Sequence, residues 1–320
     1  MKMSINTCGS RIRSPRDAIL HLVFGITIGY LIGILLFFDG DNDVSEHIHL
    51  VNHESPTGQQ QQPFHLRCVI ILHKSLHKPE KVVSAIHDGY TKLCNETIYF
   101  TNNQKLFNKL EKNHTMFFVD SSANHYYWSY YQYVMEFSSK VPAQWTFIGD
   151  DQTYLIVPNL QQTLRNFDST EPMIFGKIKD TSNFLSWVFP FSSYQKVSIR
   201  GGAVFSNSAI DLLSQCKGFF FSRSSDFALY DCSVKYRVRL VDPFDEDALR
   251  LFNDLPPKQI IAPDSSVFRR DPSKGGKCSD HAVSFGQLSE KDMRVLEYGT
   301  RVKVFGRGGL ETSETNQTVL

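Results

Sequence analysis

Short apolar segments alternate with segments of helical periodicity beyond residue 66, and this alternation limits the possible folds more than any other feature of the chain. The apolar segments have the length of buried strands, and the segments between them carry apolar residues three or four positions apart. Strands that alternate with helices predict an α/β domain with a mainly parallel central sheet. We predict strands at residues 68–72, 97–100, 116–119, 145–149, 173–176 and 198–206, and helices at 82–93, 106–110, 124–137, 209–213 and 226–232.

The predicted strand that begins at Trp145 ends at two adjacent carboxylates, Asp150 and Asp151, and a second apolar run follows them. In an open α/β sheet, ligands bind at the carboxyl ends of strands. Hard divalent cations prefer carboxylate oxygens, so this pair is a candidate metal and nucleotide-binding site. An exposed acidic turn that binds nothing is the alternative. The next residue, Gln152, adds no negative charge, which weakens any cation site here.

Composition supports a packed domain and argues against one class of partner. The chain has 320 residues, of which 41% are hydrophobic and 13% aromatic, enough to build a sizeable core. Its formal net charge is +1. Nucleic-acid-binding proteins concentrate positive charge on one surface, so we expect no nucleic-acid partner.

An apolar run of twenty-one residues, Ala18 to Phe38, contains no Asp, Glu, Lys or Arg. It is long enough to span a bilayer core of about 30 Å. Basic residues precede the run and acidic residues follow it, so the positive-inside rule places residues 1–17 in the cytosol and the remainder in the lumen. We therefore predict a single-pass type II protein with a transmembrane signal anchor at 18–38. A cleaved signal peptide is the alternative.

Gly25, Gly29 and Gly33 recur on one face of this predicted helix. Small residues at that spacing allow two membrane helices to approach closely, so one interpretation is a homodimer. The other is that glycine is simply common in membrane helices. Residues 39–65 are polar and show no hydrophobic periodicity, which predicts a flexible luminal stem before a luminal domain at 66–320.

Cysteines and glycosylation sequons fit an oxidising, luminal environment. Five of the six cysteines lie beyond the predicted anchor. We predict disulfides between Cys68 and Cys94, a strand and the end of the following helix, and between Cys216 and Cys232, which leaves Cys278 unpaired. Sequons that permit N-glycosylation begin at Asn95, Asn113 and Asn316.

Residues 277–285, Lys-Cys-Ser-Asp-His-Ala-Val-Ser-Phe, are the most distinctive motif of the chain. With Leu296-Glu297-Tyr298 beyond it, this motif resembles the C-terminal signature of the core 1 β1,3-galactosyltransferase family, which attaches galactose to O-linked N-acetylgalactosamine. The resemblance implies a GT-A type fold, an endoplasmic reticulum or Golgi membrane location, and ordinarily UDP-galactose with Mn²⁺. Further matching segments are Lys92-Leu93-Cys94, Asp150-Asp151, Thr153-Tyr154, Asn159-Leu160, Gly201-Gly202 and Asp226 to Cys232.

The chain departs from the family pattern at the positions that carry its chemistry. Family members place a third aspartate after the acidic pair, where this chain has Gln152, and a metal-binding histidine where it has Gly286. Before the helix predicted at 226–232, the family has an acidic pair. This chain has Ser225-Asp226 there and so keeps one carboxylate. Residues 271–278 lack the aromatic acceptor segment and the doubled cysteine of the family.

These departures predict a protein without the metal-dependent activity, because metal polarisation of the leaving diphosphate is a large part of such catalysis. The resemblance is greatest to the transferase-like chaperone of this family. It implies a client-specific chaperone, with the core 1 galactosyltransferase as its client and no cofactor. The alternative is a divergent active galactosyltransferase, in which Asp150 and Asp151 hold Mn²⁺ and Asp226 is the catalytic base. A lectin that reuses the pocket is a third interpretation.

Overall fold

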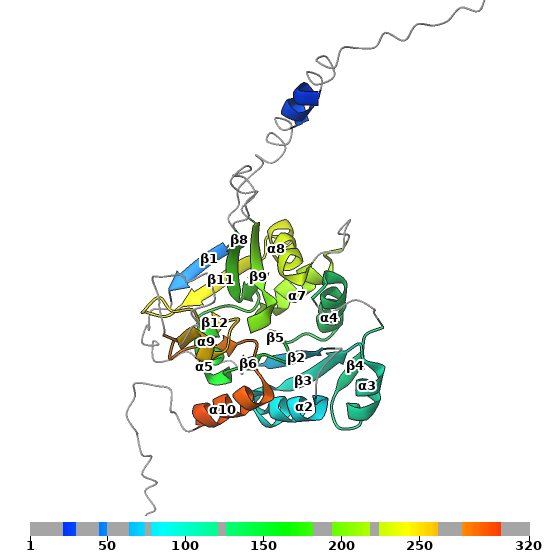
Figure 1. Ribbon diagram of the computed structural model, residues 1–320, viewed down its shortest axis with the longest axis vertical. Coiled ribbons are helices and arrows are strands. Elements are labelled where there is room, and N and C mark those ends of the chain that lie inside the picture. The colour runs from blue at the N-terminus through cyan, green and yellow to red at the C-terminus, as the bar shows by residue number, and fades with distance from the viewer. Residues whose placement is uncertain are drawn as a thin grey trace, which may run out of the picture. The chain divides into compact units, whose positions relative to one another are not determined.

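A computed structural model of the chain describes residues 22–29, 45–49, 64–73, 78–120, 126–181, 194–217, 224–261 and 277–301 (Figure 1). The chain divides into two units, Met1–Asp43 and Val44–Leu320. In the first unit, residues 22–29 form a helix. Within the described ranges, no helix combines the length and the apolar character needed to cross a membrane. Most of residues 18–38 lies outside these ranges, as does Gly33, so the signal anchor and its dimer face stay predictions.

The second unit is built on an eight-stranded sheet with the strand order β1-β11-β7-β10-β5-β2-β3-β4. Strand β10 runs antiparallel to its neighbours β5 and β7, and the other neighbouring strands pair in parallel. The predicted α/β class with a mainly parallel central sheet is therefore confirmed. The strands are β1 (Ser45–His49), β2 (Leu66–Leu72), β3 (Glu96–Thr101), β4 (Met116–Phe118), β5 (Trp145–Asp150), β7 (Met173–Phe175), β10 (Ala203–Ser206) and β11 (Arg239–Phe244).

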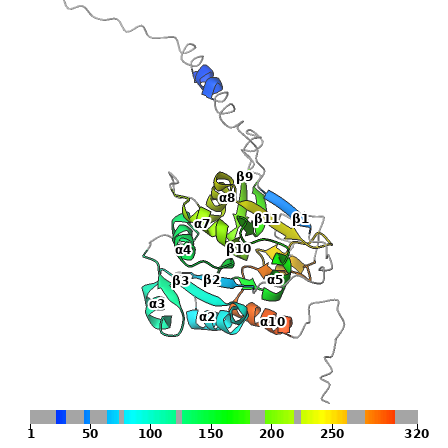
Figure 2. The same cartoon turned by 180° about the vertical axis from the view of Figure 1, so that it is seen from behind.

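Helices cover both faces of this sheet, as the ribbon shows from either side (Figures 1 and 2). Side chains alternate between the faces of a strand, so Ile70 of β2 joins one apolar core and Ile71 joins the other. Cover on both faces explains why every residue of β2 and of β5 is buried. The first core holds residues of α2 (Pro79–Asp88), α3 (Gln104–Leu110), α5 (Val157–Leu164) and α10 (Glu290–Arg301), and the second holds residues of α4 (Trp128–Lys140), α7 (Asn207–Ser214) and α8 (Ser225–Tyr236).

Two smaller sheets and several short helices complete the described part of this unit. The segment 198–206, predicted as one strand, is instead the end of β9, a 3₁₀ turn (η2) and β10, because a glycine pair breaks the extended backbone there. A two-residue strand, β6, lies between the acidic turn and α5. The bounds are β6 (Tyr154–Leu155), β12 (Phe252–Asn253) and β13 (Ser284–Phe285) in one sheet, β8 (Lys177–Thr181) and β9 (Tyr194–Ser198) in the other, and η1 (Tyr90–Leu93), η2 (Ile199–Gly201) and α9 (Pro257–Ile261) among the helices.

The structure differs from the predicted stem at residues 45–49. These residues form β1, the edge strand of the large sheet, and pair in parallel with β11 from Ser45 opposite Leu240 to His49 opposite Phe244. An edge strand is held by main-chain hydrogen bonds on one side, so it does not need the apolar alternation that sequence reasoning looks for. The stem prediction therefore fails for this segment.

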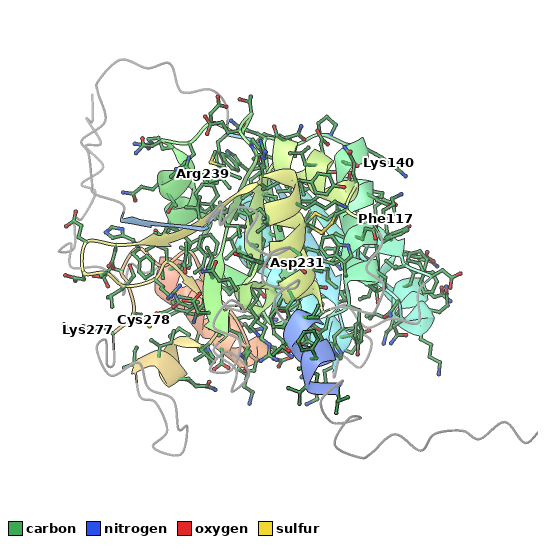
Figure 3. The ribbon with its side chains drawn as sticks, turned by 90° about the horizontal axis from the view of Figure 1, so that it is seen from above. Phe117, Lys140, Asp231, Arg239, Lys277 and Cys278 are labelled. Carbon is green, nitrogen blue, oxygen red and sulfur yellow. A yellow bond between two sulfur atoms is a disulfide. The ribbon has the colours of Figure 1, made fainter. Side chains whose placement is uncertain are left out.

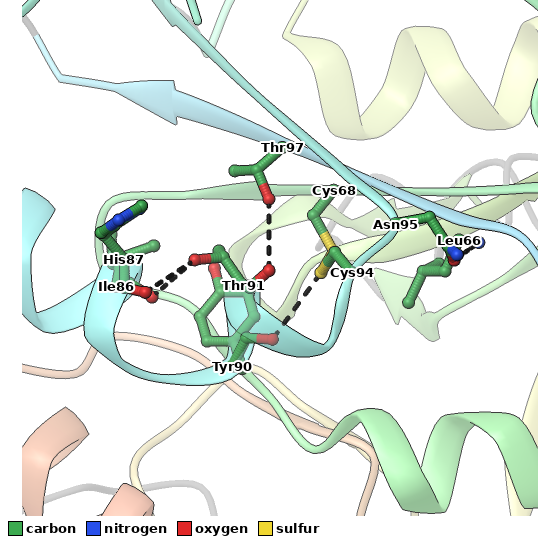
Figure 4. The surroundings of a disulfide bond; sticks show 9 residues. All are labelled: Leu66, Cys68, Ile86, His87, Tyr90, Thr91, Cys94, Asn95 and Thr97. Carbon is green, nitrogen blue, oxygen red and sulfur yellow. Dashed lines mark hydrogen bonds between the residues drawn. A yellow bond between two sulfur atoms is a disulfide. The ribbon is translucent and has the colours of Figure 1, made fainter. Parts of the chain in front are cut away.

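Both predicted disulfides form. Cys68 of β2 is joined to Cys94 at the end of η1, and Cys216 after α7 is joined to Cys232 of α8 (Figure 4 shows the first). Cys278 is free and half-buried next to Lys277 (Figure 3), and burial raises the pKa of its thiol to about 11.

Two of the three predicted sequons lie within the described ranges. Asn95 and Asn113 are both exposed, and Asn316 falls outside. The Asn95 side-chain oxygen accepts a hydrogen bond of 2.8 Å from the Leu66 amide (Figure 4), which ties the loop after the first disulfide to the start of β2. Occupancy of the sequons stays a prediction.

Removal of the first disulfide tests its role in the core. We expect the double substitution Cys68→Ala and Cys94→Ala to lower the free energy of unfolding by about 3 kcal/mol, because the crosslink closes a loop and restricts the unfolded chain. The sequence separation is 26 residues. Denaturant unfolding of the variant beside the parent protein measures the loss. Equal unfolding midpoints for the two proteins would contradict this prediction.

Candidate functional site

The acidic turn at the end of β5 is held by its own carboxylates. The Asp150 carboxylate accepts hydrogen bonds from the Gln152 amide at 3.0 Å and from the Thr153 hydroxyl at 2.6 Å. The Asp151 carboxylate accepts one from the His73 amide, which follows the adjacent strand β2, at 3.2 Å. An aspartate that bonds to the amide two residues further on closes a tight turn. Both aspartates therefore shape the junction between strand and helix.

This turn is buried, so the alternative of an exposed acidic turn is wrong. Asp150 is 9% exposed and Asp151 2% exposed. Burial raises the pKa of the Asp150 carboxyl, against the opposing effects of its hydrogen bonds from Thr153 and Gln152 and of the Arg200 charge. Burial, and then the charge of Asp150, raise the pKa of Asp151 to about 7. Two carboxylates that share a buried site resist ionising together, because like charges repel strongly where water is excluded.

Asp226 lies at the first turn of α8, facing the same side of the sheet as Asp150. Asp150 lies two residues beyond Ile148, whose side chain packs in the core covered by α4 and α8. One Asp226 oxygen accepts a hydrogen bond of 3.1 Å from the Ile199 amide, and the other is 3.8 Å from the Lys196 ammonium. Burial raises the pKa of Asp226, and these partners oppose the shift.

The charges that act on Tyr126 show that Asp150, Asp151 and Asp226, the acidic residues predicted for the site, lie in one region. The pKa of Tyr126 is raised by burial and then by the charges of Asp150, Asp151 and Asp226, while Arg200 opposes them. Among the described residues, however, no three His, Cys, Asp or Glu side chains come together in a group that could hold a metal ion. Asp150 and Asp151 could offer oxygens to a cation, but the position after them holds the amide of Gln152.

Gly286, where the family pattern has a histidine, is pressed against the main chain of η2. A β-carbon at this position would lie 2.1 Å from the carbonyl oxygen of Arg200. No side chain fits there unless the backbone moves. Two neighbouring glycines make similar contacts: a β-carbon on Gly201 would lie 2.6 Å from the Asn253 carbonyl oxygen, and Gly202 adopts a φ of 72°. The main chain at Arg200 therefore occupies the space that a metal-binding side chain at position 286 would need.

The C-terminal motif packs directly on the acidic turn. Strand β13 pairs antiparallel with β6, with Phe285 opposite Tyr154. The Asn159 amide donates a hydrogen bond of 2.7 Å to the Ala282 carbonyl, and the Tyr154 hydroxyl donates one of 2.7 Å to the Glu297 carboxylate. Segments that lie far apart in the sequence, and that carry the resemblance to the galactosyltransferase family, thus form one junction.

A group of charged residues beside this site was missed by the sequence reasoning. Asp254, which follows β12, is 4% exposed and bonds to the ammonium groups of both Lys177 and Lys179 of β8. Burial would raise the pKa of Asp254, but the two lysines hold it at about 2. The sequence did contain one indication of this group. Lys177 and Lys179 have one residue between them, a spacing that places both side chains on the same face of a strand.

Comparison with known proteins shows that the sequence of this chain is similar to that of a galactosyltransferase. No family model matches the chain. It is 24% identical over 275 residues to glycoprotein-N-acetylgalactosamine 3-beta-galactosyltransferase 1 of Xenopus laevis, a match that covers 79% of this chain and 70% of that protein. Among solved structures, the chain is similar to the apo structure of the bifunctional glycosyltransferase WbbM, with 12% identity and a TM-score of 0.33, over 60% of this chain and 41% of that one. The sequence similarity supports a glycosyltransferase-like chain.

The close approach at Gly286 predicts a large effect of a single methyl group. We expect Gly286→Ala to lower the free energy of unfolding by about 3 kcal/mol, the upper end for overpacking, because the clashing neighbour is main chain. Gly176→Ala is the matched control, since a β-carbon there lies 3.4 Å from the nearest atom, an ordinary contact. Denaturant unfolding compares the two variants, and equal costs would refute the closure at position 286.

Burial of Asp151 predicts a pH dependence of stability. Its carboxyl has a pKa of about 7 in the folded protein and about 3.9 when unfolded. Between these values unfolding releases a proton, so the free energy of unfolding should fall as pH rises from about 4 to about 7, by at most about 1.4 kcal/mol per pH unit. Asp151→Asn should remove this slope, and the exposed Asp180→Asn should keep it. Thermal unfolding in EDTA across this pH range decides; identical slopes in parent and Asp151→Asn would exclude the idea.

Proposed function

We propose that the chain is a glycosyltransferase-like protein without transferase activity that assists the folding of core 1 β1,3-galactosyltransferase, in the manner of the chaperone Cosmc. The observation that carries the proposal is the closed contact between Gly286 and the Arg200 carbonyl. It removes both the ligand and the space at the position where the family pattern has a metal-binding histidine. The similarity to a galactosyltransferase at 24% identity supports a common ancestry with the proposed client.

The electrostatics of the acidic turn support the same proposal. A divalent ion needs ionised ligands, and burial raises the pKa of both Asp150 and Asp151. Both carboxylates are also committed to hydrogen bonds that hold the turn. If Mn²⁺ bound at this edge of the sheet together with UDP-galactose, the ion would neutralise the charge of the leaving diphosphate. Asp150 and Asp151 are the predicted residues that would hold the ion. With Gln152 in the third position, we propose that no cofactor is used.

The cellular location and membrane orientation that we propose follow from the predicted transmembrane topology. We propose a single-pass type II protein of the endoplasmic reticulum or Golgi membrane, with residues 66–320 in the lumen. The glycine face of the predicted anchor would allow two copies to form a homodimer. Two disulfides in the luminal domain suit an oxidising compartment.

A second candidate function is a divergent active β1,3-galactosyltransferase, favoured by one observation. Asp226 is a partly exposed carboxylate whose pKa is raised by burial. A carboxylate whose pKa is raised is a stronger base than an exposed one, and is therefore better able to accept the proton of an acceptor hydroxyl. In this candidate Asp226 would accept the proton of the GalNAc hydroxyl as that oxygen bonds to the anomeric carbon of galactose and the bond from that carbon to UDP breaks. Asp150 and Asp151 would hold the metal that neutralises charge on the departing UDP.

One pair of measurements separates these candidates. We expect the full-length protein in detergent to transfer no galactose from UDP-galactose and Mn²⁺ to a GalNAc acceptor, while core 1 galactosyltransferase activity falls at least tenfold in cells that lack the protein. Re-expression of either the parent chain or Asp226→Asn should restore that activity, because a chaperone does not need the base. Galactose transfer by the purified protein that Asp226→Asn abolishes would establish the enzyme instead.

A further inference from the structure

Two N-glycosylation sequons lie within the described ranges, and the exposure of their asparagines does not distinguish them. Asn95-Glu96-Thr97 follows the first disulfide, and Asn113-His114-Thr115 lies between α3 and β4. Both asparagines are exposed. Transfer of an oligosaccharide requires that an enzyme reach the asparagine side chain and the hydroxyl two residues further on together. The contacts that hold each sequon therefore decide which of them the folded chain offers.

Asn95 is fixed to β2 by both its main chain and its side chain (Figure 4). The Asn95 amide donates a hydrogen bond of 2.9 Å to the Leu66 carbonyl, and the Asn95 side-chain oxygen accepts one of 2.8 Å from the Leu66 amide. The preceding residue, Cys94, is joined by the disulfide to Cys68 of the same strand. The Asn95 side chain therefore turns away from the sheet only if the contact that begins the pairing of β2 with β3 breaks.

The other two residues of this sequon are part of the sheet. In the parallel pairing of β3 with β2, Glu96 lies opposite Arg67 and Thr97 opposite Cys68. Glu96 also forms an ion pair of 2.6 Å with the buried Arg67 side chain. The Thr97 hydroxyl donates a hydrogen bond of 3.4 Å to the Thr91 carbonyl of η1. An enzyme could bind this sequon only if the start of β3 separated from β2.

The second sequon presents the same two groups to solvent. Asn113 and Thr115 are exposed, and within the described ranges neither the Asn113 side chain nor the Thr115 hydroxyl has a hydrogen-bond partner. The ring of His114 between them packs on the rings of His87 and Tyr99, at centroid distances of 4.9 Å and 5.4 Å. The main chain is also fixed, because the Tyr99 amide donates a hydrogen bond of 2.9 Å to the Thr115 carbonyl. The fold therefore exposes both reacting groups without any rearrangement.

We propose that Asn113, with the hydroxyl of Thr115, is the N-glycosylation site of the folded domain, and that Asn95 accepts an oligosaccharide only before β2 and β3 pair. The donor is an oligosaccharide joined to a lipid diphosphate. The Asn113 side-chain nitrogen bonds to the first carbon of the sugar and loses one proton, and the bond from that carbon to the diphosphate oxygen breaks. The lipid diphosphate leaves with the electron pair of the broken bond.

This modification rests on the luminal location proposed above and goes beyond the chaperone function. Formation of the first disulfide and pairing of β2 with β3 end the period in which Asn95 can react. Asn113 stays reactive after that point, because the turn that carries it exposes the sequon in the folded state. The degree of modification at Asn95 therefore reports how soon this part of the sheet forms.

Oligosaccharide transfer to the purified full-length protein in detergent tests the assignment without reference to its location in a cell. The protein is made without oligosaccharides and with Asn316→Gln, and is incubated with oligosaccharyltransferase and the lipid-linked donor. We expect transfer to Asn113 alone in the native protein, and to both Asn95 and Asn113 in protein whose cysteines were reduced and alkylated under denaturing conditions. Mass spectrometry after enzymatic deglycosylation locates the sites, because release of the oligosaccharide leaves an aspartate.

The third residue of the second sequon provides the control. Thr115→Val should abolish transfer to Asn113 in the native protein, and Thr115→Ser should retain it, because only the second variant keeps a hydroxyl. The proposal is overturned if the native protein accepts the oligosaccharide at Asn95 as readily as at Asn113, or if it does not accept it at Asn113.

Expression of the full chain in cells tests the role of the first disulfide. Cys68→Ala with Cys94→Ala should raise the fraction of chains modified at Asn95 at least about twofold, because the crosslink no longer holds the start of β3 against β2. Cys216→Ala with Cys232→Ala is the matched control, since this disulfide joins α7 and α8 in the second core. It should leave the fraction at Asn95 as in the parent chain, and equal effects of the two double variants would contradict the proposal.

The two experiments also separate this site from the proposed location. If the purified native protein accepts an oligosaccharide at Asn113 but the protein from cells carries none at any sequon, the luminal location is wrong and the assignment of Asn113 stands.

Discussion

The contact between the Arg200 carbonyl and Gly286 connects the three parts of the molecule on which the site depends. Arg200 belongs to the turn between β9 and β10, Gly286 follows β13, and the hydroxyl oxygen of Thr153 in the acidic turn lies 3.3 Å from the same carbonyl oxygen. Main chain in such close contact with a glycine leaves no room for a side chain. The chain thus gains a rigid junction at the edge of the large sheet and gives up a position that could have held a metal ligand.

Electrostatics around this junction are arranged in two layers. Asp150 and Asp151 are buried and serve as hydrogen-bond acceptors for their own turn. Outside them, the β8–β9 pair presents lysine side chains whose partner carboxylates are less exposed than they are, and η2 presents the exposed side chain of Arg200. In a metal-dependent transferase an acidic site recruits a cation that then binds the diphosphate. Here the acidic pair is buried in its own turn, and the more exposed side chains around it, those of Lys179, Lys196 and Arg200, carry positive charge.

Much of the fold followed from local patterns. The strand at Cys68–Leu72 and the pairing of Cys68 with Cys94 were predictable because buried strands are compact apolar runs, and because a strand and the end of the next helix lie within reach of each other. Strand β1 was not predictable, since an edge strand needs main-chain partners rather than an apolar pattern. The break at Gly201 and Gly202 was visible as a glycine pair, but its cause was not, because the atoms that crowd those positions come from Phe147 and Asn253.

The sequence by itself determined the fold class, the two disulfides, and the absence of a third aspartate and of a histidine at positions 152 and 286. These depend on residue identity and on neighbours along the chain. Only the tertiary structure decided that the acidic turn is buried, that position 286 is closed by main chain, and that Lys179 faces Lys196. Each of these is a relation between segments distant in sequence, set by register and packing, and a linear pattern of residues carries no record of which distant atoms will be its neighbours.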